Sequence, residues 1–153
     1  MCGIYLTNQP LQVNEVKKRV EKIQFRGPDN TDVIKIDQVI LAHLRLSILD
    51  LDKRSNQPMR RNNLILVFNG EIYNYKDLKE ELLTKGYEFN STSDSEVLLV
   101  GYMEWKEDVV NKINGMFSFC IYDIENNFVF GARDRLGVKP FYYSWNDGEF
   151  EIC

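Results

Sequence analysis

The sequence has one histidine, three cysteines and no long apolar run among its 153 residues. One histidine and no Cys-x-x-Cys pair leave a structural zinc site without ligands at workable spacing, so we expect no metal. Cys2, Cys120 and Cys153 are odd in number and widely spaced, which argues against a disulfide framework. The apolar runs fall far short of the roughly 20 residues that a membrane-spanning helix requires. Because a basic or apolar leader is also missing, we expect a cytoplasmic protein with reduced thiols that starts at its first residues.

Positive charge is not in surplus either. Lysine and arginine total 19 against 23 aspartates and glutamates, which gives a formal net charge of -4. Scattered basic residues in an acidic chain argue against a nucleic-acid partner. The hydrophobic share is 44% and the charged share 27%, which is enough apolar material for a packed interior. The length suits one domain, so we expect residues 1–153 to form a single core.

The N-terminal half alternates between strand and helix patterns. Residues 3–7 read as a short strand, and the apolar positions from Val13 to Ile23 recur at helical spacing. Residues 39–44 and 64–68 are apolar runs of strand length, typical of strands that are buried on both faces. The polar segment 50–63 between these runs contains a proline, so we expect it to be an exposed excursion.

The C-terminal half continues with helices and then hairpins. Asn74 is a candidate cap for a helix that ends near Gly86, and a second helix is expected over 95–105. Beyond residue 115 the periodicity changes to two, and Asn126-Asn127 and Asp147-Gly148 stand where tight hairpin turns are expected. A strand, then helices, then antiparallel hairpins indicate an α+β layered domain and not a βαβ repeat.

Cys2 is the residue with the clearest chemical potential. Removal of Met1 would leave a thiol and a free α-amine on one residue, and an α-amine titrates near 7.7 to 8.0, so it can accept the thiol proton at neutral pH. No histidine partner is then required. The one histidine, His43, lies in an apolar run where a packed, hydrogen-bonded imidazole is expected. Read alone, however, Cys2 is better interpreted as a small hydrophobic residue at the start of a strand.

Several segments in the same order carry a family resemblance. They are Met1-Cys2-Gly3-Ile4, Phe25-Arg26-Gly27-Pro28-Asp29, Leu41-Ala42-His43-Leu44-Arg45-Leu46-Ser47-Ile48, Phe68-Asn69-Gly70-Glu71-Ile72-Tyr73-Asn74, Thr92-Ser93-Asp94-Ser95-Glu96-Val97, Gly115-Met116-Phe117-Ser118-Phe119 and Arg133-Asp134-Arg135-Leu136-Gly137-Val138-Lys139-Pro140. Together they resemble the N-terminal, class-II glutamine amidotransferase domain of glutamine-hydrolysing asparagine synthetases. The resemblance covers essentially the whole chain. It implies an N-terminal-nucleophile (Ntn) hydrolase fold, a four-layer αββα sandwich of two antiparallel sheets between helices.

The resemblance also implies catalytic roles. Cys2 matches the nucleophile that attacks the δ-carboxamide of glutamine. The side-chain amide of Asn69 and the backbone N–H of Gly70 match the oxyanion hole, whose two donors must be preorganised in a dry pocket. Asn-Gly taken alone would indicate only a hairpin turn.

Substrate-binding roles follow in the same way. Arg45 matches the arginine that takes the α-carboxylate of glutamine, a task that suits a planar fork. Asp94 and Glu71 match the acids that take the α-ammonium. Without the resemblance, Asp94 would read as a helix cap and Arg45 as a surface charge. Arg26 is a further candidate, which could equally serve to shape its loop, and the turn at Arg133-Asp134 and residues 137–140 is expected to be structural.

The resemblance predicts an enzyme that performs the glutaminase half of an amide ligase reaction in asparagine biosynthesis. Its expected partners are glutamine and a synthetase domain or subunit that accepts ammonia; homo-oligomerisation stays open. No segment matches the Ser-Gly-Gly-x-Asp-Ser loop of the ATP-binding synthetase domain, so ATP and magnesium are expected only in that absent domain and not in this chain. Two alternatives remain: a non-catalytic docking or regulatory module, and a fragment of a full synthetase.

Overall fold

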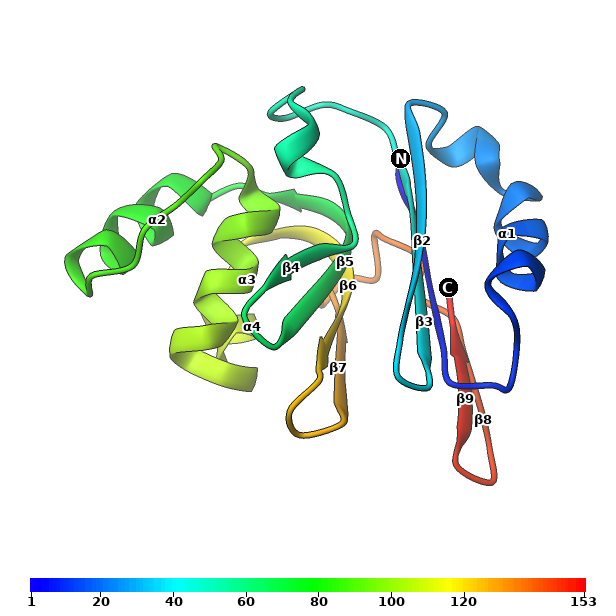
Figure 1. The fold of residues 1–153 in the computed structure, drawn as a ribbon. Coiled ribbons are helices and arrows are strands. Elements are labelled where there is room, and N and C mark those ends of the chain that lie inside the picture. Colours follow the sequence, from blue (N-terminus) through cyan, green and yellow to red (C-terminus); the bar gives the residue numbers. More distant parts are fainter.

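The computed structural model describes residues 1–153 as two antiparallel sheets stacked face to face, with helices on both outer faces (Figure 1). The first sheet has the order β2-β3-β1-β9-β8, with bounds β1 Gly3–Thr7, β2 Asn30–Ile36, β3 Val39–Arg45, β8 Tyr143–Asn146 and β9 Glu149–Ile152. The second has the order β4-β5-β6-β7, with bounds β4 Met59–Arg61, β5 Leu64–Ile72, β6 Gly115–Asp123 and β7 Phe128–Arg133. The helices are α1 Val13–Glu21, α2 Tyr75–Thr84, α3 Asp94–Trp105 and α4 Val109–Lys112. The predicted αββα sandwich is confirmed.

The strand β3 is buried along its whole length because it is covered on both faces. Val39 and Leu41 belong to the apolar cluster between the two sheets, whereas Ile40 packs with α1. Successive strand residues point to opposite faces, so His43 and Arg45 continue the row that faces the second sheet. The continuous apolar run predicted a strand that is buried on both faces, and the layers on either side supply the physical reason.

The segment 50–63 corrects one expectation. We predicted an exposed excursion, but β4 lies within it and pairs with β5, and Gln57 and Met59 are buried. The side-chain Oε1 of Gln57 accepts a hydrogen bond of 2.6 Å from the backbone N–H of Phe68, and Met59 packs into the core beneath α3. The polar composition of the segment was therefore misleading, because Gln57 can be buried when its side chain hydrogen-bonds the neighbouring strand β5.

Asn74 starts α2 as predicted, but its side chain does not cap the helix. Its amide nitrogen donates to the carbonyl of Lys112, and its oxygen accepts from the N–H of Asn114, so it joins the start of α2 to the end of α4. The predicted helix end is confirmed, since α2 stops at Thr84 and Gly86 follows with a φ of 88°.

The predicted hairpin turns are confirmed at both places. Asn127, Asp147 and Gly148 have positive φ angles of 45°, 47° and 84°, in the left-handed region that Asn, Asp and Gly tolerate best. These turns join β6 to β7 and β8 to β9. No helix in the structure combines the length and the apolar character needed to cross a bilayer.

Candidate active site

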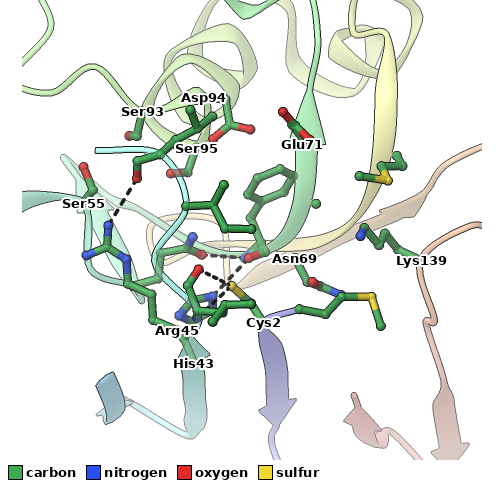
Figure 2. Close-up of a pocket in the computed structure, with 18 residues that line it drawn as sticks. Cys2, His43, Arg45, Ser55, Asn69, Glu71, Ser93, Asp94, Ser95 and Lys139 are labelled. Atoms are coloured by element: carbon green, nitrogen blue, oxygen red, sulfur yellow. Dashed lines mark hydrogen bonds between the residues drawn. The ribbon is translucent and has the colours of Figure 1, made fainter. Parts of the chain in front are cut away.

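A cleft opens between the two sheets where β1 begins, β3 ends and β5 runs on beyond the short β4 (Figure 2). Its cavity volume is about 110 Å³. A single water needs roughly 10–15 Å³ of such space, so the cleft has room for a ligand of amino-acid size. Six of the seven predicted site residues line it: Cys2, Arg45, Asn69, Gly70, Glu71 and Asp94.

Cys2 lies half-buried immediately before β1. Its Sγ accepts a hydrogen bond of 3.4 Å from the N–H of Leu46 and lies 3.6 Å from the carbonyl oxygen of the same residue. Both contacts come from the residue that follows β3, because β1 and β3 are neighbours in the sheet. Met1 lines the cleft beside Cys2 and is 53% exposed.

Arg26 supports this position from outside the cleft. Its Nε donates a hydrogen bond of 3.1 Å to the backbone carbonyl of Cys2. The loop that carries it packs closely on β3: a Cβ on Gly27 would lie 2.2 Å from the carbonyl of Leu44. The structure therefore places Arg26 as a support for the backbone of Cys2, and not among the side chains that line the cleft.

Asn69 and Gly70 lie where β5 has no neighbour on one edge. The backbone N–H of Phe68 donates to the Gln57 side chain and that of Ile72 to Asp94, so both point away from β6. In an antiparallel strand the backbone N–H groups of every second residue point to the same edge, and Gly70 lies midway between Phe68 and Ile72. Its N–H therefore points to the same open edge, into the cleft, where no side chain accepts it.

Close packing explains why residue 70 is glycine. A Cβ there would lie 2.3 Å from the carbonyl oxygen of Met116 and 2.7 Å from the Cα of Phe117. The side chain of Asn69 is 3% exposed and makes no hydrogen bond within the protein, which leaves its amide free to bind a ligand. The two predicted oxyanion donors thus lie side by side, unused, at the edge of the cleft that β5 forms.

Arg45 is buried, and the loop that follows it engages its guanidinium. NH1 donates to the carbonyl of Asp52 at 3.0 Å and to the side chain of Asn56, and NH2 donates to the carbonyls of Leu49, at 3.4 Å, and Asp50. Its Nε has no partner. The side chain that we predicted to bind a carboxylate therefore also holds the loop over residues 46–56 in place.

Asp94 is the first residue of α3 and is 5% exposed. Its Oδ2 accepts a hydrogen bond of 3.0 Å from the N–H of Ile72. Burial raises the pKa of this carboxyl group and the charge of Glu71 adds to the effect, while backbone hydrogen bonds from Ile72 and Ser95 oppose it. The two acids share one side of the cleft (Figure 2). A bound cation there would offset both the cost of burying the Asp94 charge and the repulsion between the two carboxylates.

Three residues near the cleft were not among the predicted site residues, although His43 was expected to be packed and hydrogen-bonded and Lys139 to belong to a structural turn. Asp50 binds the loop before α3, His43 joins the two sheets, and Lys139 reaches into the cleft. The turn that carries Lys139 is structural as predicted, since the carboxylate of Asp134 accepts from the N–H of Phe117, Val138 and Lys139. Lys139 lies in one of the segments that carry the family resemblance, and this was the signal that could have identified it. The direction of its side chain depends on the conformation of the turn, which the sequence does not specify.

No three side chains of histidine, cysteine, aspartate or glutamate gather in an arrangement that could hold a metal ion. The chemistry that the cleft offers is nucleophilic: one thiol, unused amide donors, a pair of acids of which Asp94 is buried and Glu71 half-buried, and basic groups at either end (Figure 2).

Comparison with known proteins identifies the family. The sequence matches the family described as "Glutamine amidotransferase domain" over residues 1–153. Asparagine synthetase [glutamine-hydrolyzing] 3 of Bacillus subtilis is 40% identical over 159 residues, which cover 98% of this chain and 26% of the relative. Putative asparagine synthetase [glutamine-hydrolyzing] 2 of Methanocaldococcus jannaschii is 38% identical over 173 residues, which cover 98% of this chain and 33% of the relative. The chain thus spans about a quarter to a third of the length of these relatives.

Solved structures agree on the fold. Glutamine phosphoribosylpyrophosphate amidotransferase from B. subtilis, in complex with ADP and GMP, superposes with a TM-score of 0.82 over 99% of this chain and 41% of its own, at 16% identity. A structure described as the allosteric regulatory enzyme of purine biosynthesis gives a TM-score of 0.61 over 97% of this chain and 35% of its own, at 18% identity. The predicted resemblance to the amidotransferase domain of asparagine synthetases is confirmed, and the chain belongs to the glutamine amidotransferase domain family.

Proposed function

We propose that this domain hydrolyses glutamine to glutamate and ammonia through a thioester on Cys2. One observation carries the proposal: a single cleft brings the Cys2 thiol together with the unused donors of Asn69 and Gly70 and with the buried acid Asp94. Each group meets one need of amide hydrolysis, namely a nucleophile, an oxyanion site and a site for the substrate's ammonium group.

The proposal requires that Met1 be removed. Cys2 then carries a free α-amine, whose ordinary pKa of about 7.7 to 8.0 lets it take the thiol proton at neutral pH, directly or through one water. The exposed position of Met1 supports this step, because a processing enzyme needs access to the bond that it cuts.

The reaction then proceeds in two halves. Sγ attacks the δ-carbon of glutamine, and the carbonyl electron pair becomes an oxyanion that accepts hydrogen bonds from the Asn69 amide and the Gly70 N–H. The carbon–nitrogen bond breaks as the α-ammonium returns its proton to the nitrogen, so ammonia leaves and a γ-glutamyl thioester remains. Water then attacks the thioester, which releases glutamate and restores the thiol.

Glutamine is held at its other end. Asp94 and Glu71 take its α-ammonium, and Arg45 takes its α-carboxylate. The guanidinium can do so through its free Nε together with the NH2 hydrogen that now reaches Leu49 at 3.4 Å, the longest of its loop contacts. Substrate binding at Arg45 therefore competes with one backbone contact of the loop and leaves the other three in place.

The names of the relatives, glutamine-hydrolysing asparagine synthetases, suggest where the ammonia goes. We propose that it passes to an ATP-dependent synthetase site in the cytoplasm and forms asparagine. The thioester route needs neither a metal nor a nucleotide, so ATP and magnesium would act only at that second site. The activity of this domain alone is then a slow hydrolysis of glutamine.

The test is glutamate release by chain that intact-mass spectrometry shows to lack Met1. We expect slow release by the wild type and none above background with Cys2→Ala. Cys153→Ser is the matched control, because Cys153 is an exposed thiol outside the cleft, and it should behave as the wild type. An acid quench during turnover should trap a γ-glutamyl adduct on Cys2.

Two results would contradict the proposal. Processed protein that binds glutamine without releasing glutamate would indicate a non-catalytic docking or regulatory module. Full activity in chain that retains Met1 would rule out the α-amine as the base, since that nitrogen would then be an amide.

A further inference from the structure

His43 connects the two sheets at the floor of the cleft. It is completely buried on β3, and its Nε2 lies 3.1 Å from the backbone carbonyl oxygen of Phe68 on β5 (Figure 2). Residues 43 and 68 are on different sheets, which are otherwise joined in this region by apolar packing. Apolar packing has no preferred direction, whereas a hydrogen bond sets both a distance and an orientation.

The protonation state of His43 follows from this contact. A carbonyl oxygen only accepts, so Nε2 carries the hydrogen and donates it. Burial, with a smaller contribution from the positive charge of Arg45, lowers the pKa of His43 to about 4, which keeps the ring neutral at physiological pH. Its Nδ1 is buried and has no partner, and the Sγ of Cys2 has only Leu46 as a partner. His43 is therefore a fixed donor and not the base that takes the thiol proton.

The two ends of this bond lie next to the two halves of the catalytic machinery. In the first sheet, His43 is directly opposite Ile4, two residues after the nucleophile Cys2. In the second sheet, Phe68 directly precedes the oxyanion donors Asn69 and Gly70. The bond thus connects the strand pair that carries the nucleophile to the strand that carries the donors.

The neighbouring contact strengthens this connection. The N–H of Phe68 donates to Gln57, so both backbone polar groups of Phe68 bind side chains at the open edge of β5. β4 ends its pairing at Leu66 and gives no support beyond it. At Phe68, the residue immediately before the two donors, the side chains of His43 and Gln57 make the hydrogen bonds that a neighbouring strand would otherwise make.

We propose that His43 is a positioning residue, which holds the oxyanion donors Asn69 and Gly70 at a set place relative to the Sγ of Cys2. The inference rests on the proposed glutaminase function. It predicts that loss of the His43 hydrogen bond lowers kcat, because the oxyanion forms only during the reaction, and leaves the KM for glutamine nearly unchanged, because Arg45 and Asp94 are untouched.

A pair of amide variants tests the geometry. In His43→Gln the side-chain amide nitrogen can occupy the place of Nε2 and donate to Phe68, whereas in His43→Asn it stands near the place of Nδ1 and falls short. We expect His43→Asn to lose roughly tenfold or more in kcat, since small misplacements of catalytic groups have effects of up to a hundredfold, and His43→Gln to recover most of it. Thermal unfolding of both variants shows whether activity simply follows stability.

The assay uses chain that lacks Met1, with the wild type run in parallel. Equal kcat for the two variants, a loss confined to KM, or a kcat that falls in step with the unfolding temperature would overturn the inference while leaving the proposed function standing. Absence of glutamate release by the wild type would overturn both.

Discussion

The carboxylate of Asp50 accepts hydrogen bonds from both the backbone N–H and the hydroxyl of Thr92, at 2.8 and 3.1 Å. Asp50 belongs to the loop that covers the cleft after β3, and Thr92 lies two residues before Asp94. The contact therefore ties the loop that Arg45 holds to the segment that carries the acid of the cleft. These hydrogen bonds, chiefly that from the Thr92 N–H, hold the pKa of Asp50 well below its usual range.

Asp50→Asn should loosen this loop. The neutral amide weakens the bonds to Thr92 and to Arg54, while asparagine keeps the positive φ of 45° at this position accessible. We expect the KM for glutamine to rise several-fold with little change in kcat, and trypsin to cut faster after Lys53 and Arg54.

Asp37→Asn is the matched control, because Asp37 is an exposed aspartate with a φ of 52° in the turn between β2 and β3. It should change neither KM nor the rate of cleavage. An Asp50→Asn enzyme with wild-type KM and wild-type cleavage would show that the contact with Thr92 does not hold the loop.

Gly70→Ala should abolish most of the activity. The added methyl group would meet the backbone of β6 at 2.3 Å, so β5 must move and take the Gly70 N–H with it. Overpacking of this kind destabilises a core by about 1–3 kcal/mol. We expect a fall in kcat of at least tenfold, measured alongside urea unfolding.

Gly86→Asn serves as its control. No atom lies within 4 Å of a Cβ at Gly86, and asparagine tolerates its φ of 88° better than other side chains do. Wild-type kcat in Gly70→Ala would contradict the assignment of this N–H to the oxyanion site.

Replacing Lys139 with methionine should raise the stability of the domain and lower its activity. It is 7% exposed, makes no ion pair or side-chain hydrogen bond, and extends into the cleft from the side opposite Arg45 (Figure 2). An ammonium that faces the cleft without an anionic partner, on a side chain that is otherwise buried, opposes folding but favours an anionic transition state. We expect Lys139→Met to raise Tm by roughly 2–4 °C, equivalent to about 1 kcal/mol for a domain of this size, and to lower glutaminase activity.

Lys18→Met removes the same charge from the exposed face of α1 and should affect neither quantity. A Lys139→Met protein with unchanged Tm and unchanged activity would show that the ammonium is well solvated and has no part in the reaction.

His43 should make the domain less stable in mild acid. Its pKa is about 4 in the folded state and 6.5 as the ordinary value, so between these limits the unfolded chain binds more protons than the folded one. Stability contributed by neutral His43 is complete above about pH 6.5 and is lost as the pH falls towards 4, by about 3 kcal/mol in total.

The measurement is the free energy of unfolding of the wild type and His43→Gln from pH 7 to pH 4. The difference between the two isolates His43 from the acids, including Asp94, whose raised pKa acts in the opposite direction over this range. Parallel curves for the two proteins would show that His43 does not titrate in this window.

Periodicity predicted most of the elements because it reports which faces of a segment are apolar. The strands β1, β3 and β5 and the helices α2 and α3 begin and end within a few residues of the expected positions. β2 and β4 were missed. β2 has no fully buried residue and its half-buried and exposed side chains do not alternate regularly, so period two is not visible in its sequence. β4 has only three residues, whose pairing with β5 depends on a distant neighbour.

Patterns along the chain were enough to predict the layered fold and to single out Cys2 as the candidate nucleophile, because local periodicity and motifs in a set order can be recognised without coordinates. The partners of the other groups became known only from the folded arrangement. It joined His43 to a carbonyl 25 residues away and Asp50 to Thr92, 42 residues away, and it turned Lys139 into the cleft. It also engaged Arg45 with its own loop and left the N–H of Gly70 on an open edge. The physical reason is that hydrogen-bonding partners are chosen by proximity in the folded chain, and spacing along the sequence does not specify that proximity.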